Sequence, residues 1–302
     1  MTDSLASLTT EKRNPRTQNL DQMTVGEMLQ VMNQEDRHVL DAVSEVIPQV
    51  EETVNIITEA VKKGGRLFYV GAGTSGRLGV IDASECPPTF MVPPDMVQAV
   101  MAGGDRAFLK ARENAEDSEE EGAHDLEQKA VTEADVIIGI TASGRTPYPI
   151  GALKYAGKIG AKTISLSCNP SSEISAFADV PIEVLVGPEV LTGSTRLKAA
   201  TAHKMILNMI STTVMVQLGK VYENLMVDVH ASNYKLRERA KRILMEVTDA
   251  GYKEAEQALD EAKYQVKPAI VMLESSVSLE EANARLRQHD GQLRRAIESR
   301  SI

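Results

Sequence analysis

The sequence predicts an α/β fold, a parallel sheet flanked by helices, followed by a small helical subdomain. Short apolar runs recur between residues 67 and 186, with helical patterns between most of them. Such alternation is typical of a parallel sheet covered on both faces. Trp is absent and aromatic residues make up only 4% of the chain, so the core must be built mainly from aliphatic side chains and Met. From residue 248 onward the pattern changes to short helical segments.

Length and charge limit the class of protein. With 302 residues, 42% of them hydrophobic, the chain can form one large domain or a medium and a small one. The formal net charge of −10 argues against a nucleic-acid partner, which would need a basic face. A local loop can still bind a phosphorylated small molecule. The two cysteines, Cys86 and Cys168, form no CxxC pair, so we expect neither a disulfide framework nor a zinc site.

The N-terminal residues lack a basic segment followed by an apolar one, and no apolar run reaches 18 residues. We therefore expect a soluble cytoplasmic protein without a membrane partner.

The elements are expected in the following order. A polar arm (1–22) precedes helices between Thr24 and Lys63, the second beginning near Pro48 and ending at Gly64-Gly65. Buried strands are predicted at 67–70, 97–101, 136–140, 163–166 and 182–186, with helices at 75–85, 106–130 and 147–160. A long, mostly apolar helix (195–218), buried or at a subunit contact, and a basic amphipathic one (233–248) follow.

The tail is predicted to hold helices at 253–263, 268–275, 279–287 and 291–299. Two stretches in it resemble each other, Ala255-Glu-Gln-Ala-Leu and Ala282-Asn-Ala-Arg-Leu. The expected domains are therefore the arm (1–22), a sugar-phosphate-binding domain (23–247) and a helical subdomain (248–302).

The first candidate loop is Gly71-Ala-Gly-Thr-Ser-Gly-Arg77, between a strand and a helix. Its glycines allow the backbone to approach an anion, and the free N–H groups of a helix start point toward it. The same G-x-G-x-x-G spacing occurs in dinucleotide-binding folds, but the acidic residue expected about 20 positions later has no clear candidate. Thr74 and Ser75 fit hydroxyl contacts to a phosphate or a sugar better.

The second candidate loop is Thr141-Ala-Ser-Gly-Arg-Thr146, which follows the strand 136–140 and precedes a helix beginning at Pro147. Hydroxyls at Thr141, Ser143 and Thr146 can converge on one anion. A tight structural turn is the alternative. Because ligands lie at the carboxyl ends of parallel strands, two such loops favour a binding site.

The third candidate loop is Leu191-Thr-Gly-Ser-Thr-Arg-Leu-Lys198, at the start of the long helix. Ser194 or Thr195 would serve as an ordinary N-cap. Lys198, one turn into the helix, favours ligand contact instead.

These loops lie in segments that resemble the N-acetylmuramic acid 6-phosphate etherases, a family of the sugar isomerase (SIS) superfamily. The segments are GAGTSGRLGVIDASECPPTF at 71–90, ENAED at 113–117, GITASGRTPY at 139–148 and GPEVLTGSTRLKA at 187–199, together with the arm TEKRNPRTQNLD at 10–21. The resemblance spans about two-thirds of the chain. The sequence departs from the family pattern at two positions. Met91 stands where the family usually has a small residue, and His203 stands at a position that varies in the family.

The resemblance implies a five-stranded parallel sheet, a UBA-like tail, a homodimer, and no metal or organic cofactor. It also implies removal of the lactyl ether from N-acetylmuramic acid 6-phosphate, giving N-acetylglucosamine 6-phosphate and D-lactate. Such an elimination needs a base at C2 and an acid for the oxygen that leaves C3.

The resemblance assigns Glu85 and Glu116 to these roles. Glu85 precedes Pro87-Pro88, which we expect to end its helix. Glu116 lies in an acidic run, and the residues alone do not distinguish it from Glu113, whereas the ENAED pattern does. The five histidines are scattered, and none pairs at metal-ligand spacing.

Two alternative functions remain open. A sugar-phosphate isomerase on the same fold would share ring opening and C2 proton transfer but keep the ether; the DASECPP segment gives it no support. A non-catalytic sugar-phosphate sensor should lack one or both carboxylates, and here both are present.

Overall fold

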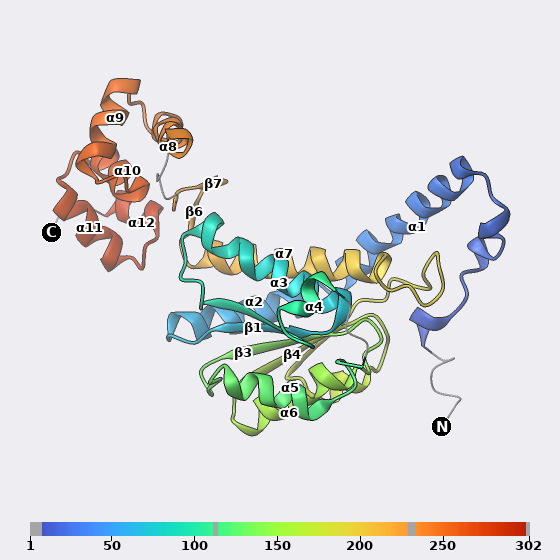
Figure 1. Ribbon diagram of the computed structural model, residues 1–302. Helices are drawn as coiled ribbons and strands as arrows, with labels where there is room; N and C mark the ends of the chain where they lie inside the picture. Colours follow the sequence, from blue (N-terminus) through green and yellow to red (C-terminus); the bar gives the residue numbers. More distant parts are fainter. Residues whose placement is uncertain (1–7, 111–113, 229–233, 300–302) are drawn as a thin grey trace. The chain divides into compact units, whose positions relative to one another are not determined.

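The computed structural model describes residues 8–110, 114–228 and 234–299 (Figure 1). They form two compact units. The first contains the residues up to Ser84 and Asp95–Ser211, and the second contains Glu85–Pro94 and the residues from Thr212 onward. Within the described ranges, no helix is long and apolar enough to cross a membrane.

The first unit contains a five-stranded parallel sheet in the order β2-β1-β3-β4-β5. The strands are β1 (Leu67–Gly71), β2 (Val97–Met101), β3 (Val136–Ile140), β4 (Lys162–Ser167) and β5 (Val180–Glu183). The predicted sheet is confirmed, but β5 begins two residues before the expected start and ends at Glu183. Pro181 is accommodated because β5 lies at the sheet edge, where one side of the strand needs no N–H donor.

Helices cover both faces of this sheet (Figure 1). Phe68, Val70 and Ile137 are buried in one cluster with residues of α5 (Glu119–Gln128) and α6 (Pro147–Lys158). The opposite face carries Tyr69 and is covered by α2 (Ile47–Lys62), α3 (Gly73–Phe90) and α7 (Lys198–Gln217). Because both faces are covered, β1 and β3 contain no charged residue and are buried at every position.

Two helix predictions were wrong. Pro87 and Pro88 do not end α3, which continues to Phe90; proline keeps a helical φ, and the carbonyl of Pro87 still accepts from the N–H of Met91. The segment 106–130 is not one helix. It contains α4 (Arg106–Leu109) and α5, and α5 starts where the Ser118 side chain accepts from the backbone N–H of Glu121.

The N-terminal arm is folded rather than extended. Its described part forms three 3₁₀ turns, Thr9–Glu11, Pro15–Thr17 and Leu20–Gln22, and then α1 (Val25–Glu45) begins at a capping box between Thr24 and Glu27. Polar side chains of the arm, Thr10 and Asn14 among them, are buried.

The second unit is mainly helical. It contains a short hairpin, β6 (Val221–Tyr222) and β7 (Leu225–Met226), and five helices: α8 (Tyr234–Val247), α9 (Tyr252–Glu261), α10 (Val266–Ser275), α11 (Leu279–Gln288) and α12 (Leu293–Glu298). Leu244 of α8 shares a core with Leu259 and Ile270. This packing places α8 with the tail helices rather than in the expected domain 23–247. Asn233, the expected first residue of α8, lies outside the described residues.

Candidate active site

The first two candidate loops follow neighbouring strands. Gly71 ends β1 and pairs with Ile140, which ends β3. The chain runs from β1 outward to β2 on one side and returns to β3 on the other, so the strand order reverses between β1 and β3. Ligands of parallel α/β proteins bind outside the carboxyl ends of the strands at such a point.

The three hydroxyls of the second loop lie together. The Oγ1 atom of Thr141 is 2.8 Å from Oγ1 of Thr146 and 3.2 Å from Oγ of Ser143. The backbone N–H of Gly144 donates to Thr141 Oγ1 and that of Arg145 donates to Ser143 Oγ. The three hydroxyls therefore form one compact cluster at the end of β3.

Glycine is required at position 144 for two reasons. Its φ is +76°, in the left-handed region, and a Cβ there would lie 2.3 Å from Oγ of Ser172. The second loop therefore packs directly on the segment after β4.

Asn169, in that segment, connects the second loop to the arm. Its buried side-chain amide donates to the carbonyl oxygens of Ala142 (3.1 Å) and Ser143 (3.3 Å) and to Thr10 Oγ1 (3.0 Å). Its Oδ1 accepts from the backbone N–H of Thr9 at 2.6 Å. Asn169 was not among the predicted site residues; the available signal was a polar Asn-Pro pair two residues after the end of a buried strand.

Close packing explains the glycine at position 76 of the first loop. A Cβ at Gly76 would lie 2.6 Å from the carbonyl oxygen of Gly71, so the first turn of α3 sits against the end of β1. Thr74 and Ser75 lie half-buried in that turn. Ser75 Oγ is 3.4 Å from Nδ1 of His203, which belongs to α7.

His203 is buried between Ser75 and Cys168, whose Sγ lies 3.4 Å from Nε2 of the imidazole. Burial lowers the pKa of His203 to about 4. Burial and the nearby Glu189 raise the pKa of the Cys168 thiol. At neutral pH both side chains are therefore uncharged. His203 connects α7 to the first loop without placing a charge there.

The third loop carries a cap that the sequence analysis did not identify. The helix α7 begins at Lys198 rather than Thr195, and the buried carboxylate of Glu189 accepts from the backbone N–H groups of Lys198 and Ala199, each at 3.0 Å. Burial raises the pKa of Glu189, although these hydrogen bonds act in the opposite direction. Ser194 and Thr195 lie half-buried before the helix and are not needed as its cap.

Lys198 is buried in an ion pair. Its Nζ donates to Oε2 of Glu35 at 2.8 Å, and Glu35 also accepts from Asn14 and pairs with Arg16. Burial acts to raise the pKa of Glu35, but the hydrogen bonds from Lys198 and Asn14 outweigh it and lower that pKa. The structure thus gives Lys198 a partner inside the protein, against the expectation that it would contact a ligand.

Glu116 lies beside the second loop. Its carbonyl oxygen accepts from the backbone N–H of Tyr148 at 3.1 Å, in the first turn of α6 that follows Thr146. Its side chain is exposed. Glu113, the alternative in the same acidic run, lies outside the described residues.

Glu85 is exposed on α3, at the start of the chain segment that belongs to the second unit. Asp82, one turn earlier, is buried and accepts from Tyr69 (2.9 Å), Asn208 (2.7 Å) and Ser211 (3.0 Å). Burial raises the pKa of Asp82, which these hydrogen bonds oppose. The aspartate of the DASECPP segment therefore fixes α3 against β1 and α7.

In the described part of the chain no cluster of three His, Cys, Asp or Glu side chains suits a metal ion.

Comparison with known proteins agrees with this geometry. Residues 49–157 match the N-terminal SIS domain of glucokinase regulatory protein. The fold is similar to that of a phosphoheptose isomerase from Neisseria gonorrhoeae, with a TM-score of 0.51 and 20% identity over 63% of this chain and 98% of the other.

Two relatives match almost end to end. The chain is 55% identical to the N-acetylmuramic acid 6-phosphate etherases of Pectobacterium atrosepticum, over 294 residues, and Bacillus pumilus, over 293. In both cases the match covers 97% of each chain. With this identity over nearly its whole length, the chain belongs to the N-acetylmuramic acid 6-phosphate etherase family.

Proposed function

We propose that this protein is a carbon–oxygen lyase that converts N-acetylmuramic acid 6-phosphate and water into N-acetylglucosamine 6-phosphate and D-lactate. The observation that carries the proposal is the hydroxyl cluster of Thr141, Ser143 and Thr146, with Glu116 beside it, in a chain of this family. The cluster offers donors for an anion, and Glu116 offers a carboxylate.

The second loop binds the phosphate in this proposal. Hydroxyl groups and the backbone N–H groups of a strand-to-helix loop are suited to phosphate oxygens. Thr74 and Ser75 of the first loop, and Ser194 and Thr195 of the third, contact the sugar. Lys198 acts indirectly, by holding α7 to Glu35.

The reaction begins with opening of the sugar ring to an aldehyde at C1. The C2 hydrogen is then α to a carbonyl, and a base removes it to leave an enolate. The C3–O bond breaks next, as a C2–C3 double bond forms. The leaving lactate oxygen takes a proton from an acid. Water then adds its hydroxide to C3 and a proton to C2, which restores both carboxyl groups. We assign the acid to Glu85 and the base to Glu116. After lactate leaves, Glu85 is a carboxylate and takes a proton from the water, and Glu116 returns its proton to C2.

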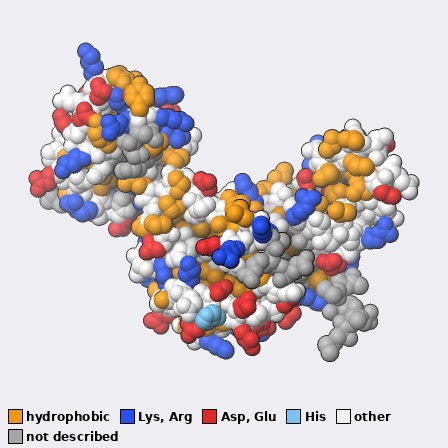
Figure 2. Space-filling model, viewed as in Figure 1, with side chains coloured by type: hydrophobic (Ala, Val, Ile, Leu, Met, Phe, Trp, Pro, Cys, Tyr) orange, Lys and Arg blue, Asp and Glu red, His pale blue; other side chains and the backbone are white. Residues whose placement is uncertain are grey.

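We also propose a homodimer. The first half of α1 has an apolar face formed by Val25, Met28, Leu29 and Met32, in which Val25 and Leu29 are 74% and 62% exposed. Figure 2 shows hydrophobic side chains gathered over this part of the molecule. The spacing i, i+3, i+4, i+7 is that of a helix face that packs on another protein surface.

Light scattering at micromolar concentration tests the dimer. The wild type should have twice the mass of one chain, and Leu29→Glu should lower the mass toward one chain. Leu109→Glu, at an exposed leucine on α4, is the matched control and should leave the mass unchanged. A single-chain mass for the wild type would contradict the proposal.

We place the reaction in the cytoplasm, since a doubly charged sugar phosphate crosses a bilayer poorly and stays in the compartment where it is phosphorylated.

Incubation with N-acetylmuramic acid 6-phosphate tests the activity. The lyase releases one D-lactate per molecule of substrate. An isomerase would convert the sugar without lactate release, and a sensor would bind it unchanged, so either result would overturn the proposal.

A further inference from the structure

The backbone of Glu116 caps the start of α6. Thr146 precedes this helix at the N-cap position, but its hydroxyl lies 2.8 Å from that of Thr141 in the hydroxyl cluster rather than serving as the cap. The N–H of Tyr148, in the first turn, donates to the carbonyl oxygen of Glu116 at 3.1 Å. Glu116 thus satisfies an N–H that an N-cap side chain usually satisfies, which leaves the Thr146 hydroxyl in the cluster.

The side chain of Tyr148 makes a second connection to the same segment. Its ring is buried in a cluster with Leu126 of α5, and Ala115, the neighbour of Glu116, packs against that cluster. Its hydroxyl donates to Oδ2 of Asp125, also on α5. Burial and this hydrogen bond raise the pKa of Tyr148, so the hydroxyl keeps its proton at neutral pH. One residue of α6 therefore contacts the chain both before and after the start of α5.

Two glycines allow α5 and α6 to lie against each other (Figure 1). A Cβ at Gly151 of α6 would lie 1.9 Å from the carbonyl oxygen of Glu119, and a Cβ at Gly122 of α5 would lie 2.0 Å from that of Tyr148. Any larger residue at either position must push the two backbones apart. Because Glu119 follows Glu116 by three residues, this close approach fixes the segment that carries Glu116.

Of the two helices, α6 is held more firmly. Seven of its twelve residues are buried, and it packs directly on β1, β3 and β4. In α5, all ten residues of which the structure describes, Gly122 and Leu126 are the buried ones. A side chain added between the helices should therefore displace α5 and leave α6 in place. Such a displacement moves Glu116 relative to the hydroxyl cluster, which stays with β3 and α6.

We propose that Tyr148 and Gly151 are positioning residues, which hold the carboxylate of Glu116 at a fixed place beside the hydroxyl cluster. Both act through Glu116 rather than on the substrate. The role rests on the proposed function, in which Glu116 is the base at C2. A base must lie within hydrogen-bond reach of the proton that it removes, and a displacement of about 1 Å can lower a rate about 100-fold.

Gly151→Ala tests the role, with N-acetylmuramic acid 6-phosphate as substrate. Lactate release at saturating substrate should fall at least about tenfold, because Glu116 is displaced. The affinity for N-acetylglucosamine 6-phosphate, measured by titration calorimetry, should stay within about twofold of the wild type, because the second loop does not move. Partial unfolding would instead lower the stoichiometry of the titration. Gly157→Ala is the matched control on the same helix, where a Cβ would enter open space among the described residues, and it should change neither value.

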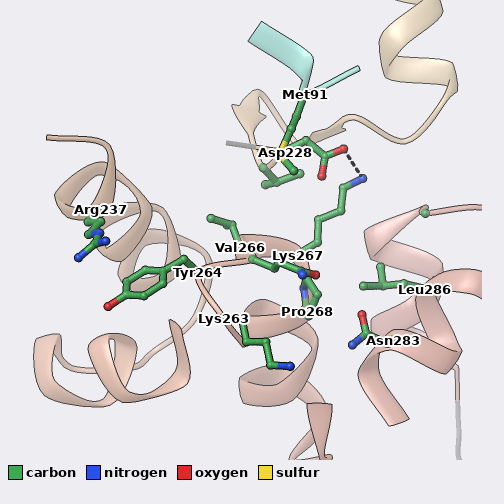
Figure 3. A pocket seen from close by; sticks show the side chains of 13 residues that line it. Met91, Asp228, Arg237, Lys263, Tyr264, Val266, Lys267, Pro268, Asn283 and Leu286 are labelled. Carbon is green, nitrogen blue, oxygen red and sulfur yellow. Dashed lines mark hydrogen bonds and ion pairs between the residues drawn. The ribbon is translucent and has the colours of Figure 1, made fainter. Parts of the chain in front are cut away.

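Tyr148→Phe is the second variant, because phenylalanine keeps the ring in place and loses the hydroxyl bond to Asp125. Lactate release should fall at least about threefold. Asp125→Asn keeps an oxygen that can accept from Tyr148, so it should retain activity within about twofold. Tyr264→Phe is the matched control. Tyr264 also bonds to an aspartate, Asp260, but lies at a cavity of the second unit (Figure 3), so its loss should leave lactate release unchanged.

A double variant separates positioning from support of the fold. A residue that acts through Glu116 has no further effect once that carboxylate is gone. In the Glu116→Gln background, Gly151→Ala should therefore change the residual lactate release by less than about twofold. If Gly151→Ala does not fold, Tyr148→Phe in the same background gives the comparison.

Two results would overturn the positioning role alone. One is a second fall of about tenfold in the Glu116→Gln background, and the other is a Gly151→Ala variant as active as the wild type. A wild type that released no lactate would overturn the proposed function, and the positioning role with it.

Discussion

The side-chain amide of Asn169 donates to the carbonyl oxygen of Ser143 at 3.3 Å and so connects the candidate phosphate loop to the N-terminal arm. The arm also contacts the segment directly before the third loop, since Thr17 Oγ1 donates to the carbonyl oxygen of Val190 and Asn14 Nδ2 to that of Pro188. Two loops that follow different strands are therefore held by one segment near the N-terminus.

Asn169→Ala should weaken the binding of the sugar phosphate by roughly tenfold or more, because a small displacement of groups that position a ligand is costly. Calorimetric titration with N-acetylglucosamine 6-phosphate, the sugar phosphate that the proposed reaction produces, measures this affinity. Thr10→Val removes only the side-chain contact between the arm and Asn169 and keeps the backbone bonds from the arm and the bonds from Asn169 to the loop, so its affinity should stay within about twofold of the wild type. Equal losses in both variants would mean that the arm, not the direct bond to the loop, determines the effect.

Ser143→Ala should weaken binding of phosphorylated sugars specifically. The lost hydroxyl bond to a charged group should cost about 1.5–3 kcal/mol of binding free energy. The comparison is between N-acetylglucosamine 6-phosphate and N-acetylglucosamine. If the affinity for both sugars fell equally, the phosphate assignment of the second loop would be incorrect.

Lys198→Met should lower the free energy of unfolding by about 3–5 kcal/mol, because it leaves the buried carboxylate of Glu35 without its ammonium partner. Urea denaturation measures the loss. The double variant Lys198→Met with Glu35→Met should recover much of it, since no uncompensated charge remains. A ligand-binding role for Lys198 would give a different result, with stability retained and affinity for the sugar phosphate reduced.

His203 should make stability depend on pH. Its pKa is about 4 in the folded protein and about 6.5 when unfolded, so between these values the unfolded chain binds the extra proton. Lowering the pH from 7 to 5 should therefore cost the wild type roughly 2 kcal/mol more than His203→Gln. Urea denaturation at both pH values gives this difference. Identical pH dependence of the two proteins would show that the imidazole is not held neutral by burial.

The centre of the sheet was predictable because β1 and β3 are buried on both faces and therefore form unbroken apolar runs. It failed where a local rule was overridden by tertiary contacts. Pro87 and Pro88 suggested a helix end, yet both rings fit a continuing helix. Because proline is rare inside strands, Pro181 led us to place the start of β5 too late. The strand accommodates this proline because it lies at the sheet edge.

The candidate site was predictable where hydroxyl residues cluster along the chain, as at Thr141, Ser143 and Thr146. It was not predictable where the partners are distant. Lys198 and Glu35 are separated by 163 positions, and Asn169 lies 159 positions from Thr10. A local sequence pattern does not indicate contacts between residues so far apart in the chain. Lys198 was therefore expected to contact a ligand, and Asn169, which contacts the second loop, was not predicted.

In the proposed mechanism Glu85 and Glu116 divide the two proton transfers. Both side chains are exposed, unlike that of the buried Asp82, which accepts three hydrogen bonds. Glu85→Gln should reduce D-lactate release by at least about 10²-fold while substrate still binds, because glutamine keeps the shape but cannot transfer the proton.

Exchange of the C2 hydrogen in deuterated water, followed by NMR in the Glu85→Gln and Glu116→Gln variants, tests the division most directly. We expect that Glu85→Gln still exchanges this hydrogen and that Glu116→Gln does not. The reverse pattern would exchange the two roles, and full lactate release by Glu85→Gln would contradict the mechanism.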